Sequence, residues 1–122
     1  MRESLTAQEE QAMSAIWKTG EGNIKTFLEN FNGDNPPPYT TLASTIKNLE
    51  KKGYLTSRLI GNMYLYKPVI GESEYKKSFL TDIVRKHFDN SYKELVAFFA
   101  EQKKITPKEL REIMDMIEKK KK

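Results

Sequence analysis

The fold is decided by residues 39–67, which read YTTLASTIKNLEKKGYLTSRLIGNMYLYK. The apolar residues in the first half of this stretch recur at the spacing of a helix with one buried face. Gly53 follows at the position where helices commonly end in a left-handed cap. We therefore expect a helix over residues 39–52, with its leucines and its isoleucine turned inward.

The second half of the stretch predicts a β-hairpin. Residues 54–60 and 63–67 are rich in alternating β-branched and aromatic side chains, which favour strands. The pair Gly61-Asn62 between them readily adopts positive φ and is typical of a tight two-residue turn. Tyr64 and Tyr66 share one face of this hairpin, and we expect both to pack on the helices; stacking on bases is the alternative.

Two further helices are predicted before this stretch. Thr6 and Glu9 have the spacing of a capping box at the start of a helix, which ends at Gly20. A short second helix is expected over about 23–30, and the three consecutive prolines in 32–38 require a loop. Three helices followed at once by a hairpin form the element order of a winged helix-turn-helix, which we expect in residues 1–70.

Residues 71–122 predict three more amphipathic helices, which begin near Ser73, after Ser91 and after Thr106. Three short helices expose more apolar surface than a small monomer can cover, so we expect this region to hold a homodimer together. The fold class is therefore mostly α with one small β-hairpin. The residues expected in the dimer contact are Phe79, Ile83, Leu95, Val96, Phe99, Leu110, Ile113 and Ile117.

The outward side of the helix over residues 39–52 is short, polar and basic. Its residues are Thr40, Thr41, Ser44, Lys47, Asn48 and Lys51, without a carboxylate among them. Small polar side chains near the start of such a helix can reach base edges in the major groove of DNA. Thr40, Thr41 and Ser44 are therefore candidate base contacts. The alternative is a polar surface helix whose threonines act only as local caps.

Positive charge concentrates in residues 36–68, which hold five basic side chains and one acidic one, while the whole chain has a formal net charge of +4. Such basic residues can meet DNA phosphates and supply affinity that does not depend on base sequence. The candidates are Lys47, Lys51, Lys52 and Arg58. A winged helix used for protein–protein interaction is the alternative, and the scarcity of acidic residues argues against it.

Composition excludes several other classes of site. The 122 residues include no cysteine, which excludes disulfides, thiolate nucleophiles and cysteine-based metal sites. The single histidine, His87, has no partner at metal-ligand or triad spacing, and we expect a structural role for it. The motifs of phosphate-binding loops and serine nucleophiles are missing too, so we expect neither an enzyme nor a cofactor. Without an apolar run of membrane-spanning length or a signal peptide, the expected location is the cytoplasm.

These motifs, in this order, resemble the penicillinase repressor family (BlaI/MecI type) over nearly the whole chain. Residues 5–17 look like the first helix of that family, and residues 39–55 look like its recognition helix and the exit from it. Residues 64–68 are similar to its second wing strand, and residues 95–99 are similar to its dimerisation segment.

The resemblance implies a homodimer that binds a palindromic DNA operator and represses neighbouring genes. The winged helix would bind DNA, with base contacts from Thr40, Thr41 and Ser44 and a phosphate contact from Asn48. The resemblance also implies release by proteolysis in the C-terminal region, triggered by a membrane-bound metalloprotease sensor.

The chain departs from the family pattern at several positions. Glu10 replaces a tryptophan of the first helix, and the three prolines replace a tryptophan-serine pair. The wing tip, Gly61-Asn62, lacks the family's basic residue. The family's scissile Asn–Phe bond aligns with Phe98-Phe99, and the missing asparagine argues against cleavage there.

Overall fold

The computed structural model describes residues 3–31, 33 and 35–120. The chain divides into two compact units, residues 1–76 and 77–122. The boundary expected after residue 70 thus lies inside the first unit. The first turn of the fourth helix belongs with that unit because Tyr75 packs on aromatic residues of the winged helix.

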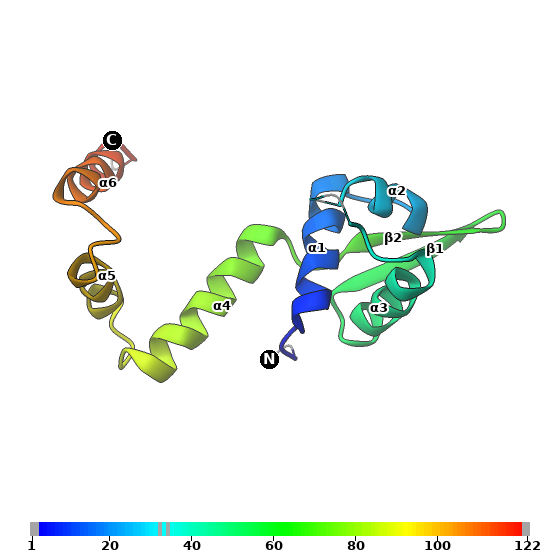
Figure 1. The fold of residues 1–122 in the computed structure, drawn as a ribbon, viewed down its shortest axis with the longest axis horizontal. Coiled ribbons are helices and arrows are strands. Elements are labelled where there is room, and N and C mark those ends of the chain that lie inside the picture. Colours follow the sequence, from blue (N-terminus) through cyan, green and yellow to red (C-terminus); the bar gives the residue numbers. More distant parts are fainter. Residues whose placement is uncertain (1–2, 32, 34, 121–122) are drawn as a thin grey trace. The chain divides into compact units, whose positions relative to one another are not determined.

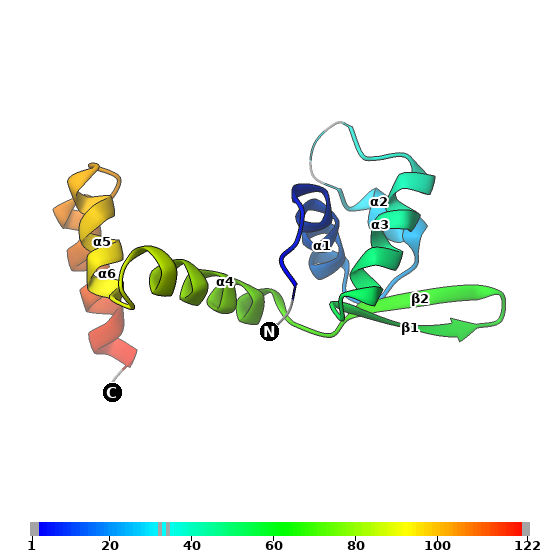
Figure 2. The same cartoon turned by 90° about the horizontal axis from the view of Figure 1, so that it is seen from below.

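The first unit is the predicted winged helix-turn-helix, and this prediction is confirmed. Three helices precede an antiparallel hairpin whose tip projects beyond them (Figures 1 and 2). Their bounds are α1 (Ala7–Thr19), α2 (Ile24–Glu29), α3 (Tyr39–Lys51), β1 (Leu55–Ile60) and β2 (Met63–Pro68).

Capping residues set the ends of these elements as the sequence predicts. The Thr6 hydroxyl accepts a hydrogen bond from the Glu9 amide at 3.1 Å, and Glu9 accepts one from the Thr6 amide at 2.9 Å. Together the two bonds satisfy amides that the helix itself leaves free. Gly53 has φ 85° just after α3, and Gly61 has φ 61° at the turn between the strands. Both glycines occupy a region of φ that side chains with a Cβ rarely adopt.

The hairpin is tied to the helices by backbone hydrogen bonds. Strand β1 pairs with β2 from Leu55↔Pro68 to Ile60↔Met63. On the other edge of β2, Gly22 and Tyr66 exchange two hydrogen bonds of 2.8 and 3.0 Å. The connection between α1 and α2 therefore fixes the base of the wing.

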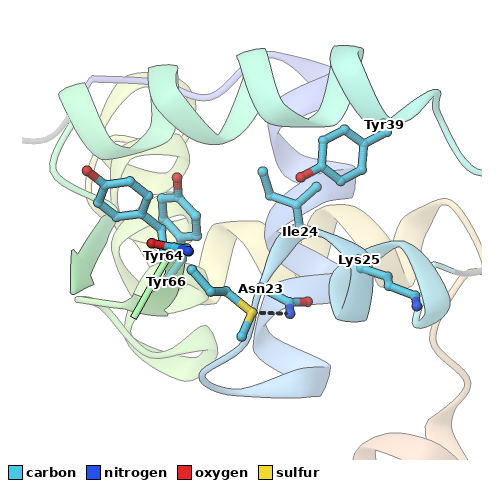
Figure 3. Close-up of a pocket in the computed structure, with 8 residues that line it drawn as sticks. Asn23, Ile24, Lys25, Tyr39, Tyr64 and Tyr66 are labelled. Atoms are coloured by element: carbon cyan, nitrogen blue, oxygen red, sulfur yellow. Dashed lines mark hydrogen bonds between the residues drawn. The ribbon is translucent and has the colours of Figure 1, made fainter. Parts of the chain in front are cut away.

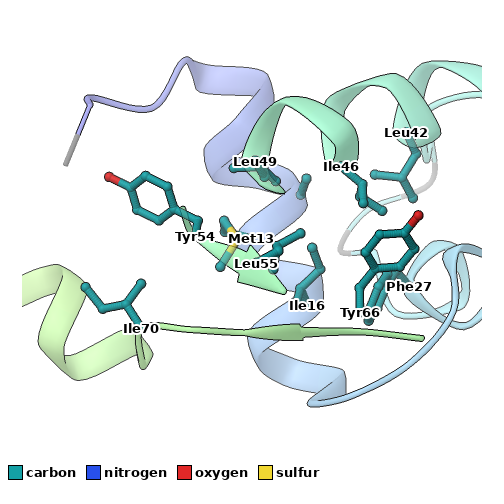
Figure 4. Packing of buried hydrophobic residues seen from close by; sticks show 11 residues of the cluster. Met13, Ile16, Phe27, Leu42, Ile46, Leu49, Tyr54, Leu55, Tyr66 and Ile70 are labelled. Carbon is teal, nitrogen blue, oxygen red and sulfur yellow. The ribbon is translucent and has the colours of Figure 1, made fainter. Parts of the chain in front are cut away.

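The core of the first unit lies between α1, α3 and the base of the hairpin (Figure 4). Complete burial of one such apolar side chain contributes about 1.5–3 kcal/mol. Phe27 of α2 and Leu49 of α3 are fully buried. Trp17 is only half-buried, and its indole N–H donates to the Ile70 carbonyl at 2.9 Å. The buried cluster is Ala12, Met13, Ile16, Phe27, Leu42, Ile46, Leu49, Tyr54, Leu55, Tyr66 and Ile70.

The expectation that both wing tyrosines pack on the helices is half wrong. Tyr66 is 8% exposed and belongs to the core, whereas Tyr64 is 54% exposed. Tyr66 lies beside Gly22 at the base of the wing, and Tyr64 is two residues nearer the tip, where the hairpin projects past the helices.

The second unit contains most of α4 (Glu72–His87) together with α5 (Tyr92–Glu101) and α6 (Pro107–Lys120). Thr106 and Glu109 form a complete capping box at the start of α6, with both hydrogen bonds present. At Ser91 the hydroxyl accepts from the Glu94 amide, while the Ser91 amide donates to the Phe88 carbonyl instead of to Glu94. Within the described residues, none of the helices is both long and apolar enough to cross a membrane.

Candidate nucleic-acid interface

The outward face of α3 is a row of exposed polar and basic side chains. These residues are spaced by three or four positions, so they lie on one side of a helix with 3.6 residues per turn. They are Thr40, Ser44, Lys47 and Lys51, and all four are exposed. The opposite side of α3 is buried through Leu42, Thr45, Ile46 and Leu49. The core thus holds the helix from behind and leaves the row free.

Thr41 and Asn48 lie at the edge of this row. Thr41 is half-buried, and its carbonyl accepts a hydrogen bond of 3.0 Å from the hydroxyl of buried Thr45. Asn48 is exposed. Two of the three predicted base contacts, Thr40 and Ser44, therefore lie on the outward face, and Thr41 lies on its flank.

The one carboxylate of α3 is turned toward the wing. Glu50 accepts a hydrogen bond of 2.5 Å from the Ser57 hydroxyl on β1. The outward row itself carries two lysines and two hydroxyls, so its charge is positive. An anionic ligand that approached this row would meet donors and cations.

Lys52 occupies a different environment from Lys51. Its ammonium lies 2.6 Å from a Glu9 carboxylate oxygen and 3.0 Å from the Ser4 carbonyl, and its side chain is 19% exposed. Burial raises the pKa of Glu9, but hydrogen bonds from Lys52 and Thr6 and the charge of Lys52 outweigh it, so the pKa is lowered overall. Lys52 therefore joins α3 to the start of α1, and Glu9 offsets the charge that it would offer to a phosphate.

Arg58 on β1 is also paired within the unit. Its guanidinium donates to both carboxylate oxygens of Glu21, at 2.9 and 3.0 Å. The hydrogen bond from Arg58 lowers the pKa of Glu21, and the same bond raises the pKa of Arg58. The pair is solvent-exposed, but Glu21 offsets the charge that Arg58 would offer to a phosphate.

The tip of the wing is apolar around its turn. Gly61 and Asn62 are exposed, as expected for a hairpin end. The four residues next to them, Leu59, Ile60, Met63 and Tyr64, are between 46% and 58% exposed. This tip therefore offers apolar contact surface where a basic side chain could have met a phosphate.

A groove of about 260 Å³ lies between α2, the first residue of α3 and the wing. Figure 3 shows Tyr39 and Ile24 on one side of it and the rings of Tyr64 and Tyr66 on the other. Its lining residues are Asn23, Ile24, Lys25, Tyr39, Asn62, Met63, Tyr64 and Tyr66.

The profile of the penicillinase repressor family matches residues 5–119. The chain belongs to the penicillinase repressor family. A penicillinase repressor of Bacillus licheniformis is 23% identical over 93% of this chain and 89% of its own length. The methicillin resistance regulatory protein MecI of Staphylococcus aureus (strain N315) is 21% identical over 95% of this chain and 94% of its own.

A solved structure supports the same family at the level of the fold. The DNA-binding domain of the repressor BlaI matches with a TM-score of 0.51 and 26% identity, over 62% of this chain and 94% of that domain. The predicted resemblance to penicillinase repressors is thereby confirmed for the sequence and for the winged-helix fold.

The predicted dimer contacts of this family member lie in the second unit, and most are exposed within it. Phe79, Val96, Phe99, Ile113 and Ile117 are between 40% and 51% exposed. Ile83, Leu95 and Leu110 are half-buried. Phe98, at the position of the family's cleavage site, is 46% exposed.

Sequence reasoning missed two kinds of residue at this interface. It missed Lys25 and Tyr39, because they lie outside the periodic apolar pattern and the groove forms only when α2, α3 and the wing come together. It also missed the pairing of Lys52 with Glu9, which was predicted only as a capping residue, and of Arg58 with Glu21. The sequence identified the basic side chains, but it did not indicate their partners, which are distant along the chain.

Proposed function

We propose that this penicillinase repressor family member represses transcription as a homodimer that binds a palindromic operator through α3. The observation that carries the proposal is the exposed, carboxylate-free row of Thr40, Ser44, Lys47 and Lys51 on a helix anchored by its opposite side. Each half of the dimer would insert one α3 into the major groove of one half-site.

The two ends of the row would make different contacts with DNA. Thr40 and Ser44 lie in the first half of α3, which a recognition helix places deepest in the groove. Their hydroxyls can donate to or accept from base edges, and the threonine methyl can contact a thymine methyl. Lys47 and Lys51, with Asn48 at the edge, would meet phosphates and supply affinity that falls with salt.

Dimerisation would come from the apolar side chains that the second unit exposes. Phe79, Val96, Phe99, Ile113 and Ile117 present more apolar surface than an isolated soluble unit usually leaves in water. A two-fold dimer would in turn require an operator with inverted symmetry.

Family membership suggests the inducing partner and the place of action. We propose that a membrane-bound metalloprotease sensor relieves repression by cleavage within residues 77–122, in the cytoplasm where the operator is. The absence of the family's asparagine from Phe98-Phe99 argues against a cut at that bond.

The operator can be found by selection with the full-length protein from a pool of random-sequence DNA duplexes. The expected product is an inverted repeat with half-site centres about 10 base pairs apart, or a multiple of that spacing. A single unrepeated half-site, or no enriched sequence, would contradict the proposal.

The selected duplex then tests the row itself. Thr40→Ala combined with Ser44→Ala should cost about 1 kcal/mol per lost hydrogen bond on the selected duplex and little on random DNA, so specificity falls. Lys51→Ala should weaken binding to both duplexes alike and reduce the slope of log K against log salt by about one. Lys86→Ala, an exposed lysine of the second unit, is the matched control.

A further inference from the structure

We propose that the groove between α2, the start of α3 and the wing holds one strand of the DNA sugar–phosphate backbone, with Lys25, Tyr39 and Tyr64 as its contacts. The inference rests on the proposed function and assigns a second, sequence-independent binding surface to the same domain.

The position of the groove follows from the position of α3. Tyr39 is the first residue of α3 and lines the groove, and the next residue, Thr40, belongs to the outward row. The opposite wall is the wing, through Met63 and Tyr64. When a helix occupies the major groove, one sugar–phosphate strand borders it on each side. The strand on the wing side would therefore pass through this groove.

The chemistry of the lining fits that strand. Phosphate oxygens only accept hydrogen bonds, and the groove offers the Lys25 ammonium and the phenol hydroxyls of Tyr39 and Tyr64. Tyr39 is 56% exposed and Tyr64 is 54% exposed, so both side chains are accessible to a ligand. None of the described residues that line the groove is a carboxylate. Ile24 and Met63 give the apolar surface that a deoxyribose ring can pack against.

The walls of the groove are held in place before any ligand arrives. The Asn23 side-chain amide donates to the Met63 sulfur at 2.8 Å, which connects the start of α2 to the wing (Figure 3). Two backbone hydrogen bonds between Gly22, the residue before Asn23, and Tyr66 also connect this segment to the wing. Tyr66, which also lines the groove, is 8% exposed and belongs to the core. A preorganised groove loses less conformational entropy on binding.

The groove also accounts for an apolar wing tip in a DNA-binding domain. With Arg58 paired to Glu21, the wing would contact DNA through Tyr64 and Met63 rather than through a basic tip. Lys25 on α2 would supply the positive charge that the tip lacks.

The test compares conservative variants on the selected duplex and on random duplex DNA. Tyr39→Phe and Tyr64→Phe each remove one hydroxyl from an exposed ring. Each should weaken binding about fivefold on both duplexes, which corresponds to about 1 kcal/mol, without changing the salt slope. Lys25→Ala should reduce the salt slope by about one. Tyr92→Phe and Lys86→Ala, in the second unit, are the matched controls and should leave binding unchanged.

Unchanged affinity in all three groove variants, while Lys51→Ala still weakens binding, would overturn this inference and leave the proposed function standing. If Lys51→Ala also had no effect, the proposed function would fail with it. A titration with inorganic phosphate alone distinguishes a groove that binds a free anion from one that binds DNA. Titrated against the full-length protein, phosphate should not saturably shift the Met63 methyl resonance. Saturable binding of phosphate together with unchanged DNA affinity of the variants would overturn the inference.

Discussion

Two neighbouring lysines show how far the role of a residue depends on its surroundings. Lys51 is exposed on the outward face of α3, whereas Lys52 is engaged by Glu9 and by the Ser4 carbonyl. A charge in the interior is stable only when it is paired, so this ion pair contributes to the fold and not to a DNA contact.

Lys52→Met should lower the free energy of unfolding by about 2 kcal/mol at neutral pH, because it leaves the buried Glu9 carboxylate without its cation. The pKa of Glu9 is lowered in the native protein. The stabilisation is therefore present above the unfolded pKa and is lost as pH falls through the folded pKa. The gap between wild type and Lys52→Met should shrink below about pH 4.

Urea unfolding followed by circular dichroism at neutral and at acid pH measures this gap. Lys51→Met is the control and should change stability by less than about 0.5 kcal/mol, because Lys51 is exposed. A gap of the same size at both pH values would show that the ion pair does not produce it.

At the scale of the elements, the wing is not a simple basic hairpin. Arg58 is paired with Glu21 from the connection between α1 and α2, and the tip around Gly61 is apolar. The wing is thus held at its base by the connection between α1 and α2, and its tip carries no basic side chain.

Glu21→Gln should strengthen binding to DNA of any sequence, because it removes a negative charge beside Arg58 and frees the guanidinium for a phosphate. The gain should be larger at low salt, where counterion release contributes more. Fluorescence anisotropy with a random duplex at two salt concentrations measures it. Arg58→Ala should weaken binding less than Lys51→Ala does, and an equal or greater loss would show that the ion pair opens on DNA.

The elements themselves could be predicted because their signals are local. The apolar period of α3, the cap at Gly53 and the turn at Gly61 all lie within a few residues of what they determine. The pairs Lys52–Glu9 and Arg58–Glu21 join residues 43 and 37 positions apart. Periodicity cannot indicate such partners, because they meet only after the helices have packed.

The whole molecule combines a unit with a closed core and a unit whose apolar side chains are largely exposed. Residues 1–76 bury a contiguous cluster, whereas Val84 is the one fully buried apolar side chain among the described residues of 77–122. This contrast supports self-association through the second unit.

Ile113→Glu should convert the proposed dimer to a monomer, because it puts a charge into the proposed apolar contact. Sedimentation velocity measures the change, and Glu112→Gln on the same helix is the control. Operator affinity should fall by at least about 100-fold, since the second half-site then binds without the gain in effective concentration. A variant that remained dimeric would show that Ile113 lies outside the interface.

Site-specific cross-linking can show whether the outward face of α3 lies in the major groove of DNA. The chain has no cysteine, so Ser44→Cys gives a single attachment point for a photoreactive group. Gln11→Cys is the control, because Gln11 lines a groove with Leu42 and Thr45 on the inner side of α3. We expect cross-links from Ser44→Cys at symmetric positions in both half-sites and none from Gln11→Cys. Cross-links from Gln11→Cys alone would contradict this expectation.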